Sequence, residues 1–504
     1  MLTKSELLSF RQCPRKLWLE RQRSELLPEP DSTSDRRAID GFKVGEKARE
    51  ILGAEVLWPS GHGDKAEAAK WARELLRNAP DRPAVEVPML REQLYARADA
   101  MVPIDGGYAL RETKASTFPL KNDNVTPGAA HAHHLDDVAI QAWVMEASGL
   151  DCARVELNLL NNQWRYPGGD DYRGLIRQLD VTGLLSERRA QVPIWLKAAQ
   201  EVVAGPMPSA LTGKQCSDPY DCPFVSFCKT QESPEPQHPI ELLPDSAGKA
   251  LARTLREGKG YTSILEPAPE ELVGKAAALY ARMQDAHRGG RAILEPGARE
   301  VLRRFGYPRY YFDFEGIDLP VPRWIGVRPY EHVPFQWSCH IEREPGVLAH
   351  AEFLDLSGED PSLRCIDAMS LAIDPDDGGP IFVYHAPYER GRLEQLADRR
   401  PDHAELLQRY IDRLVDLLPL VKENFYDPRM RGSFSIKKVL PVIADDLRYD
   451  ELDEVQEGTG AQVAYLKAIF DRPDPGRMAD LDRKLRLYCR QDTWAMVEIV
   501  YFLG

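Results

Sequence analysis

A tight Asp-Gly turn sets the register of a β-hairpin in the first quarter of the chain. Residues 94–102 read as a strand, and residues 107–114 read as the returning strand after Asp105-Gly106. Two such runs around Asp-Gly predict two antiparallel strands joined by a two-residue turn. A turn centred between residues 105 and 106 pairs residues whose numbers sum to 211. Asp99 is therefore expected opposite Glu112.

This pairing places two carboxylates against each other. Like charges directly opposite on a ladder repel, and a divalent cation between them would turn that cost into a binding site. Lys114 follows Glu112 by two residues, so it projects from the same face. Two carboxylates and a lysine around one point can hold Mg²⁺ or Mn²⁺, orient a water and stabilise a charged phosphate transition state. A solvent-facing hairpin explains the three residues equally well.

Four of the eight cysteines are arranged as a possible ligand set. Cys13 lies near the start of the chain, and Cys216, Cys222 and Cys228 follow with five residues in each gap. Four thiolates can bind an iron–sulfur cluster or zinc. The paired C-x2-C knuckles of a zinc ribbon are absent, so the spacing favours a [4Fe–4S] cluster, with Zn²⁺ and unmetallated thiols as the alternatives. Such a cluster would join the two ends of one domain.

The order of these residues resembles a nuclease family. Asp99, the Glu-x-Lys of residues 112–114 and a following helix with Gln141 resemble the PD-(D/E)XK nucleases, best the RecB-like branch that includes the CRISPR-associated iron–sulfur exonucleases. The resemblance covers nearly all of residues 1–230. It implies a restriction-endonuclease-like fold, a catalytic set and an iron–sulfur cluster. The implied catalytic residues are Asp99, Glu112, Lys114 and Gln141, and the implied cluster ligands are Cys13, Cys216, Cys222 and Cys228.

A metal ligand on an early helix departs from the pattern of this branch. The branch usually carries a His there, whereas this helix reads Gly41-Phe42-Lys43-Val44-Gly45-Glu46. A carboxylate suits a hard cation, so Glu46 is expected to replace the His beside Asp99 and Glu112.

A second acidic pair lies on an aromatic strand. Residues 310–316 read as a strand by their alternation, with Phe312 and Phe314 on one face and Asp313 and Glu315 on the other. Burying two unpaired carboxylates on so apolar a strand would be costly, and a bound metal explains them.

Two later acids complete this set. Glu389 falls in the first turn of a helix that follows the apolar strand 380–384, where the helix dipole alone could also explain it. Tyr488 and Asp492 are four residues apart and share one face of the last helix, which is otherwise apolar.

Asp313-x-Glu315, Tyr388-Glu389 and Tyr488-x3-Asp492 together resemble the DEDD 3′–5′ exonucleases of the RNase H-like fold. The resemblance covers residues 305–504 and implies four carboxylates that bind two metal ions, with Tyr488 orienting the attacking water. Glu389 stands where most members have Asp. Asp416 lies between the second and third motifs, where it could support the substrate strand or simply belong to a surface helix. The metal ligands implied are Asp313, Glu315, Glu389 and Asp492.

The organisation follows from composition. We expect an α/β protein with a RecB-like domain at 1–230, a Pro-rich linker and helical region at 231–304, and an RNase H-like domain at 305–504, a layout that resembles a bacterial fusion family. The net charge of −14 argues against a protein that coats nucleic acid by bulk charge. Without a stretch of ~18 apolar residues or a signal-peptide pattern, we expect a cytoplasmic protein with no membrane partner.

The sequence therefore predicts a metal-dependent exonuclease with two active sites that acts on DNA or RNA, preferably at single-stranded ends. A nucleic-acid-binding scaffold with one or no active site is the alternative, and an unrelated metalloenzyme is a third. His131, His133 and His134 follow Pro127-Gly128 and are expected in a mobile loop rather than in a metal site.

Overall fold

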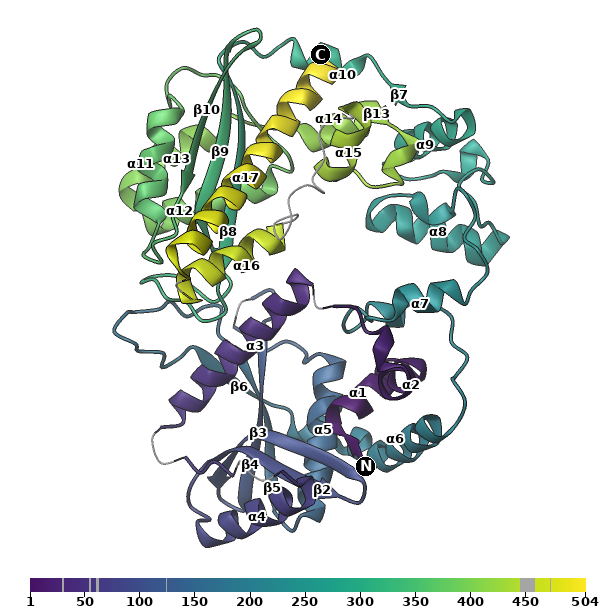
Figure 1. Ribbon diagram of the computed structural model, residues 1–504, viewed down its shortest axis with the longest axis vertical. Coiled ribbons are helices and arrows are strands. Elements are labelled where there is room, and N and C mark those ends of the chain that lie inside the picture. The colour runs from purple at the N-terminus through teal and green to yellow at the C-terminus, as the bar shows by residue number, and fades with distance from the viewer. Residues whose placement is uncertain (30, 54–55, 60–62, 124, 445–457, 472) are drawn as a thin grey trace. The chain divides into compact units, whose positions relative to one another are not determined.

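The computed structural model describes residues 1–504 except 30, 54–55, 60–62, 124, 445–457 and 472, and the chain divides into two compact units (Figure 1). Unit 1 comprises residues 1–234 and 319–330, and unit 2 comprises residues 235–318 and 331–504. Each unit contains a β-sheet and helices, so the α/β prediction is confirmed at this level. No described helix is both long and apolar enough to cross a membrane.

Unit 1 is built on a six-stranded mixed sheet. Its strands run in the order β1-β3-β4-β5-β6, and β2 also pairs with β3. The strands are β1 (Leu2–Thr3), β2 (Ala84–Arg91), β3 (Leu94–Ile104), β4 (Gly107–Thr117), β5 (Cys152–Leu160) and β6 (Ile176–Asp180). The helices are α1 (Lys4–Gln12), α2 (Pro14–Gln22), α3 (Ser32–Ile51), α4 (Lys65–Asn78), α5 (Ala132–Ala147), α6 (Ser186–Ala204) and α7 (Val225–Thr230).

The hairpin of β3 and β4 has the predicted register. Ala100 lies opposite Arg111 and Ile104 opposite Gly107, so every paired position sums to 211. The turn is possible because Gly106 has φ +85°, in the left-handed region that favours glycine. The core of unit 1 packs the apolar face of α5, including Val138, Ala139 and Ala142, against the sheet.

Unit 2 contains a five-stranded mixed sheet in the order β10-β9-β8-β11-β12. β8 is central, antiparallel to β9 and parallel to β11. The strands are β8 (Arg309–Asp318), β9 (His332–Glu344), β10 (Val347–Leu354), β11 (Ile381–Val383) and β12 (Leu414–Asp416), and a separate ribbon joins β7 (Ile293–Leu294) to β13 (Phe425–Tyr426). The helices are α8 (Asp245–Lys259), α9 (Ala277–Gly289), α10 (Gly297–Leu302), α11 (Ser362–Ala372), α12 (Pro387–Arg399), α13 (Ala404–Ile411), α14 (Leu417–Asn424), α15 (Ile436–Ile443), α16 (Gly458–Leu466) and α17 (Pro475–Leu503).

The two faces of the unit 2 sheet differ as the alternation on β8 predicted. Phe312 and Phe314 are buried in a cluster with apolar residues of α11, α12 and α13. The long helix α17 crosses the sheet on the side of Asp313 and Glu315 (Figure 1). On that side Thr493 Oγ1 contacts both Ser338 Oγ at 2.9 Å and His340 Nδ1 at 2.8 Å, which anchors α17 to β9.

The region expected as a linker and helical segment packs mainly into unit 2. The boundary between the units falls at residues 234 and 235. Ile240, Leu255 and Leu279 lie in one apolar cluster with Tyr311 and Phe382 of the sheet. Burial of these side chains holds α8 and α9 against the rest of the unit.

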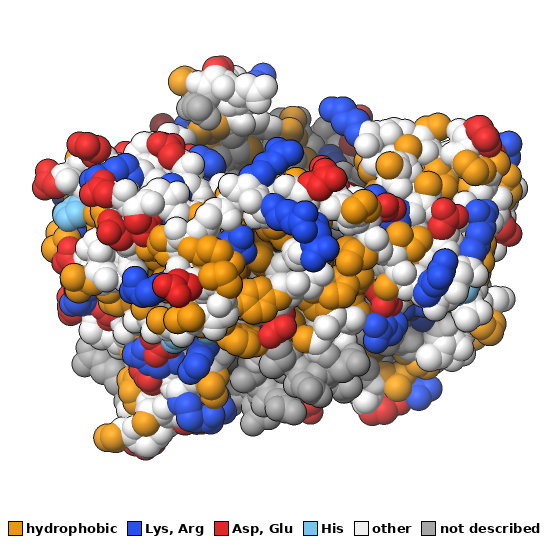
Figure 2. Space-filling view, turned by 90° about the horizontal axis from the view of Figure 1, so that it is seen from above, with side chains coloured by type: hydrophobic (Ala, Val, Ile, Leu, Met, Phe, Trp, Pro, Cys, Tyr) orange, Lys and Arg blue, Asp and Glu red, His pale blue; other side chains and the backbone are white. Residues whose placement is uncertain are grey.

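The surface carries both signs of charge. Figure 2 shows a face on which Lys and Arg side chains are interspersed with Asp and Glu around a group of apolar side chains. No continuous basic surface covers this face, in keeping with the net charge of −14.

Candidate active sites

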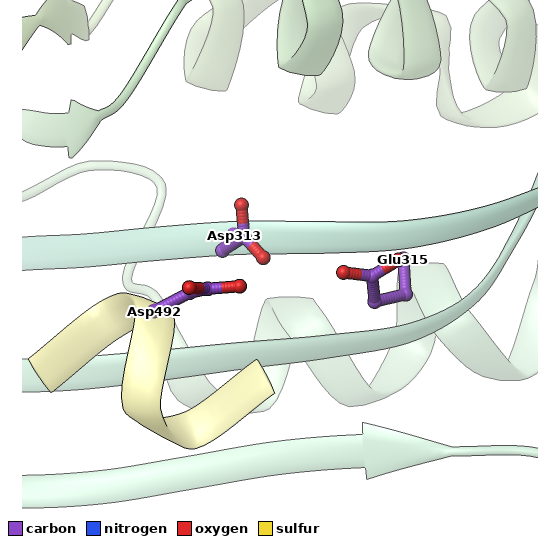
Figure 3. A group of neighbouring side chains, drawn as sticks. All are labelled: Asp313, Glu315 and Asp492. Atoms are coloured by element: carbon purple, nitrogen blue, oxygen red, sulfur yellow. The ribbon is translucent and has the colours of Figure 1, made fainter. Parts of the chain in front are cut away.

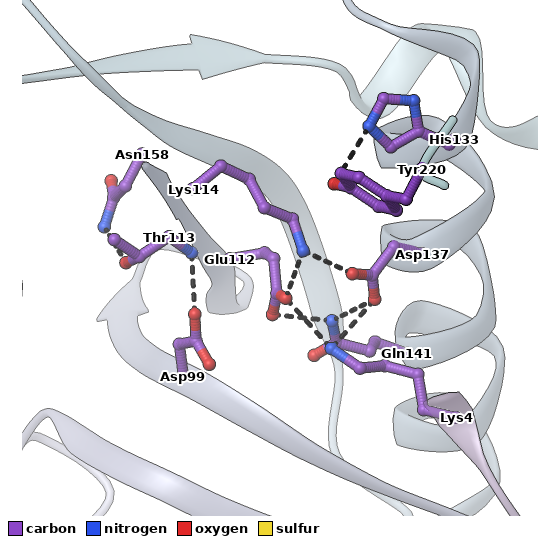
Figure 4. A network of polar contacts seen from close by, with 10 residues as sticks. All are labelled: Lys4, Asp99, Glu112, Thr113, Lys114, His133, Asp137, Gln141, Asn158 and Tyr220. Carbon is purple, nitrogen blue, oxygen red and sulfur yellow. Dashed lines mark hydrogen bonds and ion pairs between the residues drawn. The ribbon is translucent and has the colours of Figure 1, made fainter. Parts of the chain in front are cut away.

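The first candidate site gathers Asp99, Glu112 and Lys114 on the β3–β4 hairpin (Figure 4). Asp99 Oδ2 accepts a hydrogen bond from the backbone N–H of Thr113 at 2.8 Å. Lys114 Nζ lies 2.8 Å from Glu112 Oε1. Gln141 is fully buried on α5, and its Nε2 donates to Glu112 Oε2 at 2.7 Å. The four catalytic residues expected from the sequence therefore lie together.

Two further charged residues belong to this network and were not predicted from the sequence. Lys4 Nζ lies 2.9 Å from both Glu112 Oε1 and Asp137 Oδ1. Asp137 is buried, forms an ion pair with Lys114 and accepts a 2.9 Å hydrogen bond from Gln141 Nε2. Asp137 was detectable, because it precedes Gln141 by four residues and therefore shares its helix face. Lys4 gives no such local signal, since it lies 108 residues from Glu112.

Opposite charges hold the network in its ionised form. Burial alone would lower the pKa of Lys114, but the carboxylates of Glu112 and Asp137 outweigh it and raise that pKa above its ordinary value. Burial and then the charge of Glu112 raise the pKa of Asp99 to about 7. A nearby cation would therefore favour the ionised form of Asp99.

Glu46 lines the same cavity as the hairpin carboxylates. This cavity has a volume of about 820 Å³ and is also lined by Asp99, Glu112 and Glu86. The Glu46 side chain is 40% exposed and lies 3.4 Å from Lys43 Nζ. Within the described ranges, Glu46, Asp99 and Glu112 do not bring three ligand atoms within 4.8 Å of one another. The structure thus places Glu46 at the cavity without assembling a compact ligand set there.

The four cysteines expected as cluster ligands line one small cavity. Cys13 precedes α2, and Cys216, Cys222 and Cys228 come from the segment around α7. All four are free thiols. In the part of the chain that the structure describes, no three of the four sulfurs lie within 4.8 Å of one another. Tetrahedral Zn–S bonds of ~2.3 Å would place sulfurs roughly 3.8 Å apart. The present spacing is wider than a single zinc ion would give.

The prediction of a loop at His131, His133 and His134 was wrong. His131 is the N-cap of α5, and the other two histidines lie in its first turn. The helix begins this early because Leu135, Val138 and Ala139 are buried in the unit 1 core. That burial outweighs the weak helix signal of the preceding Gly/Ala-rich run.

The second candidate site is a compact carboxylate cluster. Ligand atoms of Asp313, Glu315 and Asp492 all lie within 4.8 Å of one another, and Figure 3 shows the three side chains converging from β8 and α17. Burial and the charges of Asp492 and Glu315 raise the pKa of Asp313 well above its usual range. Burial and Asp492 do the same for the pKa of Glu315. Mutual repulsion of this kind is relieved by a bound cation or a proton.

Glu389 and Tyr488 line the same cavity as the cluster, which has a volume of about 330 Å³. Glu389 is 1% exposed, and its Oε2 has no hydrogen-bond partner among the described residues. Burial and the charge of Asp416 raise the pKa of Glu389 to about 8. A buried carboxylate oxygen without a partner fits a metal ligand. All five residues expected at this site are therefore brought together.

Asp416 supports the segment that carries Glu389. Its Oδ1 accepts from the backbone N–H groups of His385 and Leu418, and its Oδ2 from that of Ala386, each at 3.0 Å. His385 has φ +79°, a conformation that costs energy for a residue with a side chain. Asp416 is thus the N-cap of α14 and also holds the backbone of the turn before Glu389, while its support of a substrate strand stays a prediction.

Asp416→Ala is expected to lower the free energy of unfolding of unit 2 by about 1–2 kcal/mol, because the N-cap of α14 is lost and the N–H groups of His385 and Ala386 lose their acceptor. Cleavage at the second site should fall at least tenfold as Glu389 moves. Chemical denaturation and turnover would measure the two effects. Asp474→Ala is the matched control: it removes an N-cap that accepts from Gly476 and Arg477 and should cost similar stability without the tenfold loss of turnover. Equal turnover losses in both variants would contradict the assignment.

Comparison with known proteins gives few named functions. Residues 310–435 match a family described as a domain of unknown function (DUF2779), a range that includes Asp313, Glu315 and Glu389. The chain is 27% identical over 238 residues to the uncharacterized protein UU173 of Ureaplasma parvum, covering 43% of this chain and 34% of that protein. It is 25% identical over 226 residues to the uncharacterized MG366 homolog of Mycoplasma pneumoniae, covering 41% and 33%.

The chain thus spans about a third of the length of the curated relatives it matches. A solved structure titled "Crystal structure of SSO0001" is 16% identical and covers 46% of this chain and 87% of that chain. Its TM-score of 0.27 is too low to support an argument about fold.

Proposed function

We propose that the chain is a metal-dependent exonuclease with two separate active sites that hydrolyses phosphodiester bonds of DNA or RNA. The observation that carries the proposal is the buried carboxylate cluster of unit 2. Asp313, Glu315, Asp492, Glu389 and Tyr488 come from three elements and line one cavity. Their order in the chain agrees with the DEDD resemblance, and the central position of β8 in a mixed sheet supports an RNase H-like assignment.

The unit 2 residues suit a pair of hard cations. Two Mg²⁺ or Mn²⁺ ions would stabilise both the entering and the leaving oxygen of the phosphodiester. Asp313, Glu315, Glu389 and Asp492 offer the oxygen ligands such ions prefer. The phenol of Tyr488 lines the cavity and would orient the attacking water. Burial of the cluster strengthens each of these interactions relative to water.

The unit 1 residues suit a second hydrolytic site. Asp99, Glu112 and the cavity-lining Glu46 are the candidate ligands for Mg²⁺ or Mn²⁺. Lys114 remains charged between Glu112 and Asp137, so it can stabilise charge that develops on a phosphate. Gln141 and Lys4 hold Glu112 in place through hydrogen bonds to its two oxygens.

The test of the proposed function is cleavage of end-labelled single- and double-stranded DNA and RNA by the full chain, purified without oxygen, with Mg²⁺ or Mn²⁺. Shortening of single strands from one end is the expected result. Binding without any cleavage would instead identify a nucleic-acid-binding scaffold. Labels at the 3′ and the 5′ end establish the polarity of each site.

The cysteine cavity supports a [4Fe–4S] cluster held by Cys13, Cys216, Cys222 and Cys228. The four cysteines line this one cavity and join the first helices of unit 1 to its last one. Zn²⁺ is the alternative.

Cys222→Ser is expected to abolish an absorbance near ~400 nm and to lower the melting temperature of unit 1 by several degrees, because ligand binding to the folded state is folding free energy. Iron analysis and thermal melts measure both. Cys152→Ser changes a thiol of unit 1 outside this cavity and serves as the control. A colourless wild-type protein loaded with zinc would refute the iron–sulfur assignment.

A further inference from the structure

The first turn of α5 borders a third cavity of unit 1. This cavity has a volume of about 470 Å³ and is lined by Arg37, Asp40, Lys114, Ala115, Ser116, His131, His133, His134, Tyr220 and Tyr330. Lys114 thus lines this cavity and also binds Glu112 of the first candidate site. A molecule in the cavity would lie directly beside the proposed site of hydrolysis.

One cation and a helix terminus of the cavity can attract an anion. Lys114 is already paired with Glu112 and Asp137, and Asp40 is paired with Arg36. The Arg37 side chain is 55% exposed, and its Nη2 lies 3.8 Å from Asp221 Oδ2. The N-terminus of α5 adds a partial positive charge, and this 16-residue helix has no side-chain cap there. The N–H groups of His134 and Leu135 both donate to the carbonyl of His131. The N–H groups of the two residues that precede them in the helix point toward its N-terminal side.

His134 independently indicates a ligand. The residue is 4% exposed and lines the cavity. Neither of its ring nitrogens has a hydrogen-bond partner among the described residues; its neighbours there are the rings of His131 and His133. Burial, His133 and Lys114 lower the pKa of His134 to about 3, so the ring is neutral and offers one N–H donor. Buried polar groups normally have partners, and a bound ligand would supply this one.

An aromatic residue from the cysteine segment completes the wall. Tyr220 lies between Cys216 and Cys222 and is 49% exposed, and its hydroxyl lies 3.3 Å from His133 Nε2 (Figure 4). Its carbonyl accepts a 2.6 Å hydrogen bond from Gln12 Nε2, next to Cys13. A half-exposed phenol beside cationic groups is the combination on which single-stranded nucleic acid stacks.

We propose that this cavity is a nucleotide subsite, formed by Arg37, His131, His133, His134, Tyr220 and the N-terminus of α5. The subsite holds one phosphate of the substrate strand, and the neighbouring phosphate of that strand is cleaved beside Lys114. This inference rests on the nuclease function proposed for unit 1 and specifies how its substrate is held. A transition-metal ion is the less suitable occupant. In the described structure no three ligand atoms of these histidines and neighbouring carboxylates lie within 4.8 Å, and Arg37 would repel a cation.

The test measures binding without turnover. A fluorescein-labelled oligothymidylate is titrated with the full chain in EDTA at several salt concentrations. Loss of one phosphate contact to a single strand reduces the slope of log Kd against log salt by about 0.7. Arg37→Ala should show this reduction, and Arg37→Ala, Tyr220→Ala and His134→Gln should each weaken binding about tenfold. Arg173→Ala, whose side chain is 88% exposed and lies outside this cavity, is the matched control.

A crosslinking experiment distinguishes strand binding at this cavity from binding elsewhere on the chain. It uses the wild-type chain, so misfolding of a variant does not affect its result. An oligonucleotide with 4-thiothymidine should crosslink to peptides that contain Tyr220 or residues 131–134 of the wild-type chain. Unchanged slopes and affinities together with no crosslink at these peptides would overturn the subsite. So would stoichiometric Zn²⁺ or Mn²⁺ that is lost in His133→Ala. If Lys114→Ala, made in an Asp313→Asn background so that only unit 1 can cleave, leaves cleavage intact while the binding results hold, the hydrolytic function of unit 1 fails and the strand-binding surface stands.

Discussion

Asp313→Asn is expected to reduce cleavage at the second site by about 10³-fold, since several kcal/mol of transition-state stabilisation depend on the cations held there. The side chain is changed by one atom, so packing is preserved. Turnover should be measured in a Lys114→Ala background, so that only the unit 2 site contributes. Glu344→Gln neutralises an exposed carboxylate on β9 of the same unit and is the control.

The same substitution should stabilise the metal-free protein. Burial and the charges of Asp492 and Glu315 raise the pKa of Asp313. At pH values above the ordinary pKa of an aspartate, ionised Asp313 therefore destabilises the folded state. Asn removes that charge. In EDTA near neutral pH the melting temperature of unit 2 should rise by about 2–4 °C for each kcal/mol recovered.

With Mg²⁺ present, the wild-type protein should melt at a higher temperature than Asp313→Asn. The wild-type cluster gains binding free energy from the ion, while Asp313→Asn has lost a ligand and gains less. Melting curves with and without Mg²⁺ measure the difference. A variant that is destabilised in EDTA, or that keeps full turnover, would contradict a metal site at this cluster.

Local side-chain periodicity accounts for what could be predicted. The Asp-Gly turn determined the register of β3 and β4 and so the facing positions of Asp99 and Glu112. The alternation on β8 separated Phe312 from Asp313. These predictions depend on a period of two residues and on turn geometry, which neighbouring residues determine.

Long-range packing accounts for what could not be predicted. The ion pairs of Lys4 require α1 to lie beside the sheet, and no local pattern places it there. The histidines of α5 were assigned to a loop because their flanking sequence is rich in Gly and Ala, whereas burial of Leu135 and Val138 extends the helix over them. The helices of residues 240–302 were expected beside a linker, and their apolar faces pack with Tyr311 and Phe382 instead.

Lys114→Ala is expected to reduce cleavage at the first site by about 10²–10³-fold, a loss typical of removing one charged group that stabilises the transition state. Glu112 and Asp137 would then share the single ammonium group of Lys4, so the pKa of Asp137, which Lys4 and Lys114 lower, should rise. Lys121→Ala, an exposed lysine of unit 1, is the control. Lys114→Arg keeps the charge and should recover part of the activity, whereas a structural role would gain nothing from it.

The double variant Lys114→Ala, Asp313→Asn separates the two sites. If each unit has its own active site, each single variant retains the activity of the other unit, and only the double variant loses cleavage of every substrate. The products that each single variant still forms then show, for the remaining site, whether it cleaves single or double strands, whether it cleaves DNA or RNA, and from which end. Complete loss in either single variant would mean that one site acts only on the product of the other. Full activity in the double variant would refute both assignments, because no remaining carboxylate cluster among the described residues has comparable geometry.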